Sequence, residues 1–267
     1  MKLGIFDSGL GGLIIAKAVH DHMPDLDIVY LGDTLRLPYG NRSDDAIYEF
    51  TRQCVEFLFS QDCNLVVIAC NTASARALRR LQQEWLPGAN YPGRNVLGVI
   101  VPTLEAALDH GYHNLGLIGT NATVNSGIYP EELKKVSEKI DITQKATPLL
   151  VPLIENEGEA WLGDVLEHYL EPLKARGCEC ILLGCTHYAL LKNQIRKHLG
   201  QGIEVLSQDE IIPAKLADYL ERHSEYADEI SRGGTIEFYV SDITPGYKAA
   251  AAKLYGREID IQKAEVA

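Results

Sequence analysis

The sequence contains no long apolar run and no excess of basic residues. No stretch approaches the roughly 20 consecutive apolar residues of a membrane-spanning helix, and Asp7 comes too early for the apolar region of a signal peptide. Its 25 Lys and Arg residues are outnumbered by 37 Asp and Glu residues, which gives a net charge of -12. An acidic chain of this kind lacks the basic surface that binds nucleic acid or an anionic membrane. We therefore expect a cytoplasmic protein with neither nucleic acid nor a membrane as its partner.

The six cysteines include no Cys-x-x-Cys pair, the spacing that zinc ribbons and thioredoxin-type redox sites use. In the reducing cytoplasm we expect all of them to remain free thiols. One metal site needs separate consideration, since Cys178, Cys180, Cys185 and His187 are close in sequence. Cys178 and Cys180 would share one face of a predicted strand, while the other two residues lie past its end. Ligands placed in this way do not converge on one ion, so we expect no metal.

Apolar runs typical of buried strands alternate with helical patterns along most of the chain. A length of 267 residues is enough for one large or two medium domains. The predicted strands include Leu3–Phe6, Ile28–Leu31, Leu65–Ala69, Val96–Val99, Ile181–Leu183, Ile203–Leu206 and Ile236–Val240. The predicted helices include Leu13–Met23, Asp45–Phe59, Ala73–Trp85, Ile211–Arg222 and Gly246–Leu254. Such alternation with short loops predicts an α/β fold with parallel sheets and helices on both faces.

The second part of the chain repeats features of the first. Leu115–Thr120 has the pattern of Leu3–Ser8, and Cys185 follows Cys70 at a nearly equal offset. Two similar offsets in the same order indicate a duplicated β-α unit. We therefore predict two pseudo-symmetric parallel-sheet α/β domains, with the active site in the cleft between them. Periodicity alone leaves open which domain the last strand and helix join.

Two segments place a cysteine at the end of a predicted strand. They are Ala69–Ala73, which reads Ala-Cys-Asn-Thr-Ala, and Gly184–Tyr188, which reads Gly-Cys-Thr-His-Tyr. The hydroxyl and amide residues that follow can cap a helix and bind an anion, and a helix start favours a thiolate. His187 can stabilise the second thiolate or carry its proton. The strand-end positions of Cys70 and Cys185 therefore predict proton transfer on both faces of one carbon atom. The other cysteines are expected to be buried apolar side chains: Cys54, Cys63, Cys178 and Cys180.

Two glycine-containing turns and one carboxylate are weaker candidates. Asp7–Gly12 follows the first strand, but its spacing differs from the dinucleotide fingerprint G-x-G-x-x-G. It is either a tight turn whose glycines need positive φ angles, or an anion site into which Asp7 also points. Pro38–Gly40 follows the second strand and, taken alone, is better explained as a structural turn. Glu155 ends an apolar segment and by itself predicts only solvated surface.

Taken together, these motifs resemble those of glutamate racemases, in the cofactor-independent aspartate/glutamate racemase superfamily. The resemblance extends over nearly the whole chain, through Phe6–Gly9, Pro38–Gly40, Ala69–Ala73, Gly119–Thr120, Val151–Glu155 and Gly184–Tyr188. It implies that Cys70 and Cys185 are catalytic and are flanked by Asp7, Glu155 and His187. It implies substrate binding at Asp7, Ser8, Tyr39, Gly40, Asn71, Thr72, Thr186 and His187.

The resemblance implies a function as well as a site. The protein is expected to interconvert L- and D-glutamate by a two-base proton transfer that needs no cofactor, metal or nucleotide. Cys70 would take the proton from D-glutamate and Cys185 from L-glutamate, and the D-glutamate would supply peptidoglycan synthesis. The family architecture divides the chain into a discontinuous first domain, residues 1–97 plus 208–267, and a second domain, residues 98–207. A homodimer is compatible with the resemblance.

Two alternative functions fit the sequence less well. An aspartate racemase of the same superfamily would have a His soon after the first Cys-Asn-Thr and a Glu after the second Cys-Thr, where this chain has Ser74 and His187. A non-catalytic protein that closes on a dicarboxylate would need neither thiol. The chain departs from the family pattern at Ile14, Ala189 and the pair Ser207-Gln208, none of which is an expected catalytic position. We therefore predict activity on glutamate.

Overall fold

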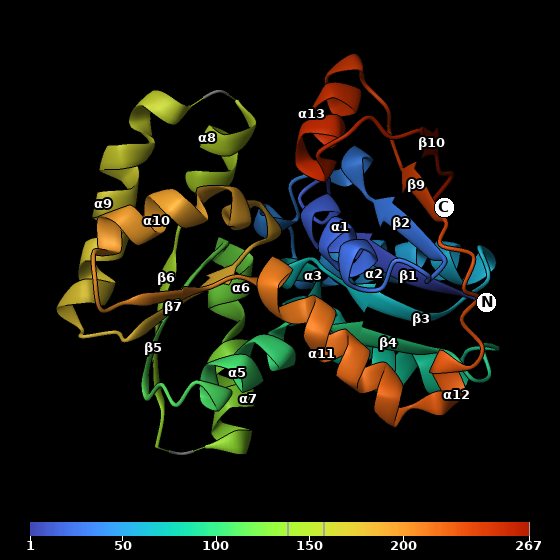
Figure 1. Cartoon of the computed structure of the whole chain (residues 1–267), viewed down its shortest axis with the longest axis horizontal. Coiled ribbons are helices and arrows are strands. Elements are labelled where there is room, and N and C mark those ends of the chain that lie inside the picture. Colours follow the sequence, from blue (N-terminus) through green and yellow to red (C-terminus); the bar gives the residue numbers. More distant parts are fainter. Residues whose placement is uncertain (138, 157, 267) are drawn as a thin grey trace.

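The computed structural model describes residues 1–137, 139–156 and 158–266, and arranges them around two parallel sheets (Figure 1). The first sheet has six strands in the order β10-β9-β2-β1-β3-β4, and the second has four in the order β6-β5-β7-β8. Every paired strand in both sheets runs parallel to its neighbour. The predicted fold class, two parallel-sheet α/β domains, is confirmed.

The first sheet and its helices come from both ends of the chain. The N-terminal strands are β1 (Lys2–Asp7), β2 (Ile28–Gly32), β3 (Cys63–Ile68) and β4 (Asn95–Gly98). The helical segments between them are α1 (Leu13–His22), η1 (Thr34–Arg36), η2 (Tyr39–Asn41), α2 (Asp44–Ser60), α3 (Asn71–Arg76), α4 (Leu78–Arg80), η3 (Leu81–Trp85) and η4 (Leu86–Gly88). The C-terminal elements are α12 (Ser224–Ala227), β9 (Ile236–Val240), α13 (Pro245–Tyr255) and β10 (Ile261–Lys263).

The second sheet is built from the middle of the chain. Its strands are β5 (Asn114–Gly119), β6 (Asp141–Ala146), β7 (Cys180–Gly184) and β8 (Glu204–Leu206). The helices before and between them are α5 (Ile100–Asp109), α6 (Asn121–Ser126), α7 (Ile128–Val136), α8 (Leu150–Glu155), α9 (Glu159–Ala175), η5 (Thr186–Leu191) and α10 (Lys192–Leu199). After β8 the chain enters the long helix α11 (Gln208–Arg222), which packs against α1 and α5.

Helices cover both faces of each sheet, so the central strands are buried throughout. β2, β3 and β7 have no exposed residue, which explains their continuous apolar sequences. Alternate residues of β1 enter different cores: Leu3 and Ile5 pack with α1, α11 and α13, whereas Phe6 packs with α2 and α3. The second sheet separates a core with α8, α9 and α10 from a core with α5 and α7. Apolar burial on both faces is therefore the main stabilising contribution.

The C-terminal elements return to the N-terminal sheet. β9 pairs with β2, β10 pairs with β9, and α13 packs against α1, so the ends of the chain lie in the same half of the molecule (Figure 1). Periodicity left this placement open, and the family resemblance assigned these elements to the first domain. The boundaries given above, residues 1–97 plus 208–267 and residues 98–207, stay a prediction.

The helix expected over Ala73–Trp85 is interrupted, because Ala77 has a φ of -115° and leaves the regular helical conformation. Within the described ranges, no helix is long and apolar enough to cross a membrane.

Candidate active site

A cavity of about 230 Å³ lies where the carboxyl ends of strands from the two sheets meet. The first or second residue after each of β1, β3, β5, β6 and β7 lines it, and this edge of the sheet is where ligands bind in parallel α/β folds. The structure brings ten of the proposed site residues to this cavity: Ser8, Tyr39, Gly40, Cys70, Asn71, Thr72, Glu155, Cys185, Thr186 and His187. Its volume is below the roughly 300–1,000 Å³ of pockets for drug-sized ligands, so it suits a smaller molecule.

Cys70 lies between β3 and α3 and is almost fully buried. Its thiol donates a hydrogen bond to Ser8 Oγ (3.2 Å), and the Ala73 backbone N–H donates to its sulfur (3.4 Å). Burial raises the pKa of the Cys70 thiol to about 12, and the negative charge of Asp7 acts in the same direction. Cys70 is therefore a protonated thiol at neutral pH. This differs from the expectation that a strand-end position favours the thiolate, because burial outweighs the hydrogen bonds that Cys70 forms with Ser8 and Ala73.

Cys185 follows β7 and has a cationic neighbour instead. Its sulfur lies 3.9 Å from His187 Nδ1, and His187 Nε2 lies 3.0 Å from Glu155 Oε1. Burial alone would lower the pKa of His187, but Cys185 and Glu155 together outweigh it and raise this pKa to about 10. The imidazole is therefore protonated at neutral pH and places a positive charge beside Cys185. Glu155 is exposed, as its sequence position predicted, and its carboxylate is also the second partner of this imidazole.

Asp7 ends β1 and lies behind the cavity rather than in its lining. Its carboxylate accepts hydrogen bonds from the Gly9 N–H (3.1 Å) and from Thr186 Oγ1 (3.3 Å). Burial raises its pKa, although the His187 charge and the hydrogen bonds from Gly12, Gly9 and Thr186 oppose that rise. Asp7 thus connects the turn after β1 to the loop that carries Thr186 and His187.

The glycines after β1 permit close approach rather than unusual backbone angles. None of Gly9, Gly11 and Gly12 has a positive φ, so the expectation of such angles in this turn is wrong. A Cβ atom on Gly11 would lie 2.5 Å from Thr186 Oγ1 and 2.6 Å from His187 Nδ1. These contacts cross from the first half of the molecule to the loop after β7. A side chain at position 11 would therefore displace the residues beside Cys185.

The buried carboxylate of Asp33 anchors the Pro38–Gly40 loop. The Tyr39 hydroxyl donates to Asp33 Oδ2 (2.5 Å), so it is already engaged and does not face the cavity as a free donor. Arg36 Nε also donates to Asp33 Oδ2 (2.6 Å), and Ser241 Oγ donates to Asp33 Oδ1 (2.7 Å). This anchor on Asp33 was missed from the sequence because its partners come from distant segments. It fixes the loop whose residues line the cavity.

Other polar residues at the cavity were also missed. Thr120 follows β5, caps α6, and shares a hydrogen bond with Thr72 across the two halves (Oγ1 to Oγ1, 2.9 Å). The internal repeat could have identified it, since Thr120 occupies the position of Ser8 in the first unit. Thr147 and Tyr188 line the cavity too and hydrogen-bond each other (2.7 Å). Tyr188 ends the Gly184–Tyr188 motif but was not proposed as a site residue, and no motif included Thr147.

The metal alternative is not supported. Among the residues that the structure describes, no group of three or more His, Cys, Asp and Glu side chains could hold a metal ion. The expectation that Cys178 and Cys180 share one face is wrong, because β7 begins only at Cys180. Cys178 packs in the core with α9, and Cys180 packs in the core with α5. Cys54 and Cys63 are buried as expected.

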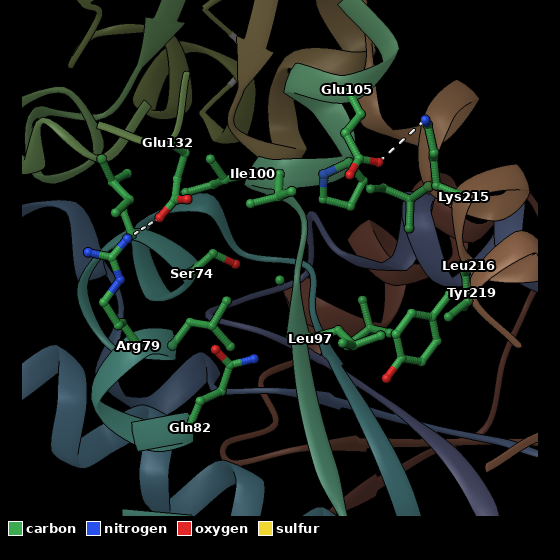
Figure 2. A pocket seen from close by; sticks show the side chains of 18 of the residues that line it. Ser74, Arg79, Gln82, Leu97, Ile100, Glu105, Glu132, Lys215, Leu216 and Tyr219 are labelled. Carbon is green, nitrogen blue, oxygen red and sulfur yellow. Dashed lines mark hydrogen bonds and ion pairs between the residues drawn. The ribbon is translucent and has the colours of Figure 1, made fainter. Parts of the chain in front are cut away.

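A second and larger cavity of about 500 Å³ lies between α5, α7 and α11 and the segment after β3. Figure 2 shows its ion pairs, Arg79 with Glu132 and Lys215 with Glu105, together with Leu97, Leu216 and Tyr219. None of the proposed site residues lines it. The strand-end thiols therefore belong to the smaller cavity.

Two thiols at the ends of strands in two related sheets, both lining one cavity, define an α/β enzyme site suited to proton transfer. The family model for Asp/Glu/Hydantoin racemase matches residues 14–211. A glutamate racemase from Aquifex pyrophilus is 40% identical over 269 residues, which cover 99% of this chain and 98% of the relative. The chain therefore belongs to the Asp/Glu/hydantoin racemase family and is an amino-acid racemase.

Solved structures agree with this membership. The crystal structure of a glutamate racemase isoform from Bacillus anthracis has a TM-score of 0.90 and 30% identity, and the alignment covers 99% of this chain and 97% of that chain. A glutamate racemase from Francisella tularensis in complex with D-glutamate has a TM-score of 0.88 and 28% identity, with the same coverage. The described fold is thus that of glutamate racemases.

Proposed function

We propose that the protein is a glutamate racemase that interconverts L- and D-glutamate by proton transfer between two cysteines. The observation that carries this proposal is the presence of Cys70 and Cys185 in the lining of one cavity, each from a different sheet. The glutamate racemases that match the whole chain support glutamate as the substrate. The Francisella tularensis relative, whose structure contains D-glutamate, supports the proposal that a protein of this fold binds that molecule.

The reaction requires one ionised and one protonated thiol at the same time. The α-proton of an amino acid is far less acidic than a thiol, and each pKa unit of mismatch adds about 1.4 kcal/mol to the proton transfer. One thiolate removes the proton, and the thiol on the other face of the α-carbon donates its own. The raised pKa of Cys70 keeps it protonated, and the His187 charge stabilises a thiolate on Cys185. This arrangement is ready for L-glutamate, with Cys185 as base and Cys70 as acid.

The substrate carboxylates would be held by hydroxyl and backbone donors. Ser8, Thr72 and Thr186 line the cavity, and hydrogen bonds to Cys70, Thr120 and Asp7 orient their side chains. Such preoriented donors can also stabilise the charge that develops when the α-proton leaves. We place the enzyme in the cytoplasm, where its D-glutamate would supply peptidoglycan synthesis. The chemistry of the cavity needs no second copy of the chain, since both thiols come from one chain.

A circular dichroism assay tests the proposal. Purified protein is mixed with L-glutamate in buffer without added cofactor, and the dichroic signal is followed as the mixture becomes racemic. The account predicts decay of the signal to zero, and the same decay from D-glutamate. A stable signal with folded protein would overturn the proposed function.

A further inference from the structure

Gln208 joins the end of the second sheet to the residue after Cys70. It is the first residue of α11, is buried, and forms a reciprocal pair of hydrogen bonds with Asn71. Asn71 Nδ2 donates to Gln208 Oε1 (2.7 Å), and Gln208 Nε2 donates to Asn71 Oδ1 (2.9 Å). Gln208 Nε2 also donates to Thr103 Oγ1 on α5 (3.3 Å). The side-chain amides of Asn71 and Gln208 therefore link α3, α11 and α5 through hydrogen bonds.

The orientation of both amides follows from their neighbours. The Thr103 hydroxyl donates its only proton to the Val99 carbonyl (2.7 Å), so toward Gln208 it can only accept. Gln208 must therefore present its nitrogen to Thr103, which leaves Gln208 Oε1 as the acceptor for Asn71 Nδ2. The Tyr129 hydroxyl donates to Asn71 Oδ1 (2.7 Å) and supplies a second donor to that oxygen. The Val99 carbonyl thus sets the orientation of Asn71 through Thr103 and Gln208.

This network determines what Asn71 offers to the smaller cavity, which it lines. Tyr129 and Gln208 occupy both lone pairs of Asn71 Oδ1, and one of its two Nδ2 protons is bound to Gln208. The group that remains is the second Nδ2–H, a donor. A donor complements a carboxylate oxygen, whereas a flipped amide would present an acceptor and repel it.

We propose that Gln208 is a positioning residue that holds the Asn71 amide with its nitrogen available to a substrate carboxylate. This inference rests on the proposed function, because it assumes a dicarboxylate in the cavity. Gln208 lines neither cavity and therefore acts only through Asn71. Further along α11, Ile212 and Leu216 line the larger cavity, and Figure 2 shows Leu216 there.

The first test is Gln208→Met, which keeps the length of the side chain and removes its hydrogen bonds. The KM for L-glutamate should rise about tenfold, as expected for the loss of one oriented hydrogen bond, while kcat changes less. Gln82→Met is the matched control, because Gln82 donates to the Val96 carbonyl (2.7 Å) and does not line the smaller cavity. The control should leave KM unchanged.

The second test is Gln208→Glu, which makes the network sensitive to pH. A protonated carboxyl group can accept and can donate one hydrogen bond, where the amide of Gln208 donates two, whereas an ionised carboxylate can only accept. The ratio of its KM to the wild-type KM should be smallest at low pH and should increase as pH rises. Of the nearby titratable groups, Tyr129 stays protonated because burial raises its pKa, and Asp209 and Glu210 are both paired with Lys192 (3.0 and 2.7 Å). Taking the ratio at each pH removes titrations that both proteins share.

The outcomes separate the two claims. An active wild-type enzyme whose Gln208 variants both behave like Gln82→Met would overturn the inference and leave the proposed function standing. If the wild-type protein does not racemise glutamate, the function is overturned, and calorimetric titration with D-glutamate decides the inference. Weaker binding by Gln208→Met than by wild type would support it, and equal or absent binding would overturn it. If Gln208→Met does not fold, the pH-dependent ratio for Gln208→Glu decides in its place.

Discussion

The two halves of the molecule place a cysteine at the same point of the fold but surround it differently. Cys70 and Cys185 each follow a buried parallel strand and precede a helical turn. Cys70 has the Asp7 carboxylate as its charged neighbour and a pKa raised to about 12, whereas Cys185 lies 3.9 Å from a protonated imidazole. Duplication of a fold therefore supplies matching positions, while the flanking side chains give the two thiols different electrostatic surroundings.

This asymmetry has a thermodynamic limit. L- and D-glutamate have equal free energy, so kcat/KM must be the same in both directions for the wild type and for every variant. A difference between the two halves can appear only in the separate kcat and KM values, in pH dependence or in isotope transfer.

The largest effect is expected when either thiol is removed. Cys70→Ser and Cys185→Ser should each lower kcat/KM by about 10²–10⁴-fold, the contribution typical of one positioned acid or base. Circular dichroism kinetics measure the rate, and thermal denaturation shows that both variants fold. Cys178→Ala is the control, because Cys178 is a core residue that should affect stability and leave turnover intact. Full activity in either serine variant would contradict the account.

Removal of the positive charge beside Cys185 should have the next largest effect. His187→Gln should lower kcat/KM by about 10–100-fold at neutral pH, since each pKa unit by which a thiolate becomes harder to form reduces its population tenfold. The pH profile of kcat/KM should also move to higher pH. A profile that keeps its position would show that the imidazole does not control ionisation in the site. His168→Gln is a suitable control, because His168 lies on α9 and lines neither cavity.

Gly11→Ala tests the contact between the two halves. The added Cβ would lie 2.5 Å from Thr186 Oγ1, so the loop after β7 must move and kcat/KM should fall about tenfold. Gly88→Ala is the control, since a Cβ there meets no atom within 4 Å. Equal activity of the two variants would mean that the loop tolerates displacement.

The smallest effect concerns stability against pH. His187 has a folded-state pKa of about 10 and an ordinary value of 6.5, so the native state holds a proton that the unfolded state loses between these values. Its stabilising contribution is complete below pH 6.5 and is lost as pH rises toward about 10. Urea unfolding at pH 6 and pH 9 should show a larger decrease for the wild type than for His187→Gln. An identical decrease would contradict the raised pKa.

The sequence predicted the two sheets and the two strand-end cysteines because both depend on local pattern. Continuous apolar runs mark strands that are buried on both faces, and the polar residues after Cys70 and Cys185 mark where those strands end. The family resemblance then drew Asp7, Glu155 and His187 into one site. In the structure, Glu155 pairs with His187 and Asp7 accepts a hydrogen bond from Thr186, and the assignment of these residues to the site stays a prediction.

Features that depend on contacts between distant segments could not be predicted in this way. Position 11 requires a glycine because Thr186 and His187, which are far along the chain, approach it closely, and not because of its own backbone angle. Local pattern likewise gave no indication that Gln208 binds Asn71 or that Asp33 binds Tyr39 and Ser241. The protonation of Cys70 follows from burial, which the helix start alone did not reveal.

Hydrogen isotope transfer in D₂O tests the two-base claim most directly. L-glutamate is incubated with the enzyme in D₂O, and product and remaining substrate are analysed for α-deuterium during the first few per cent of conversion. With Cys185 as base and Cys70 as a solvent-equilibrated acid on the other face, the D-glutamate should carry deuterium from the first turnover. The recovered L-glutamate should remain almost unlabelled. D-glutamate that retains the substrate proton, or early labelling of the L-glutamate, would contradict proton transfer by two separate thiols.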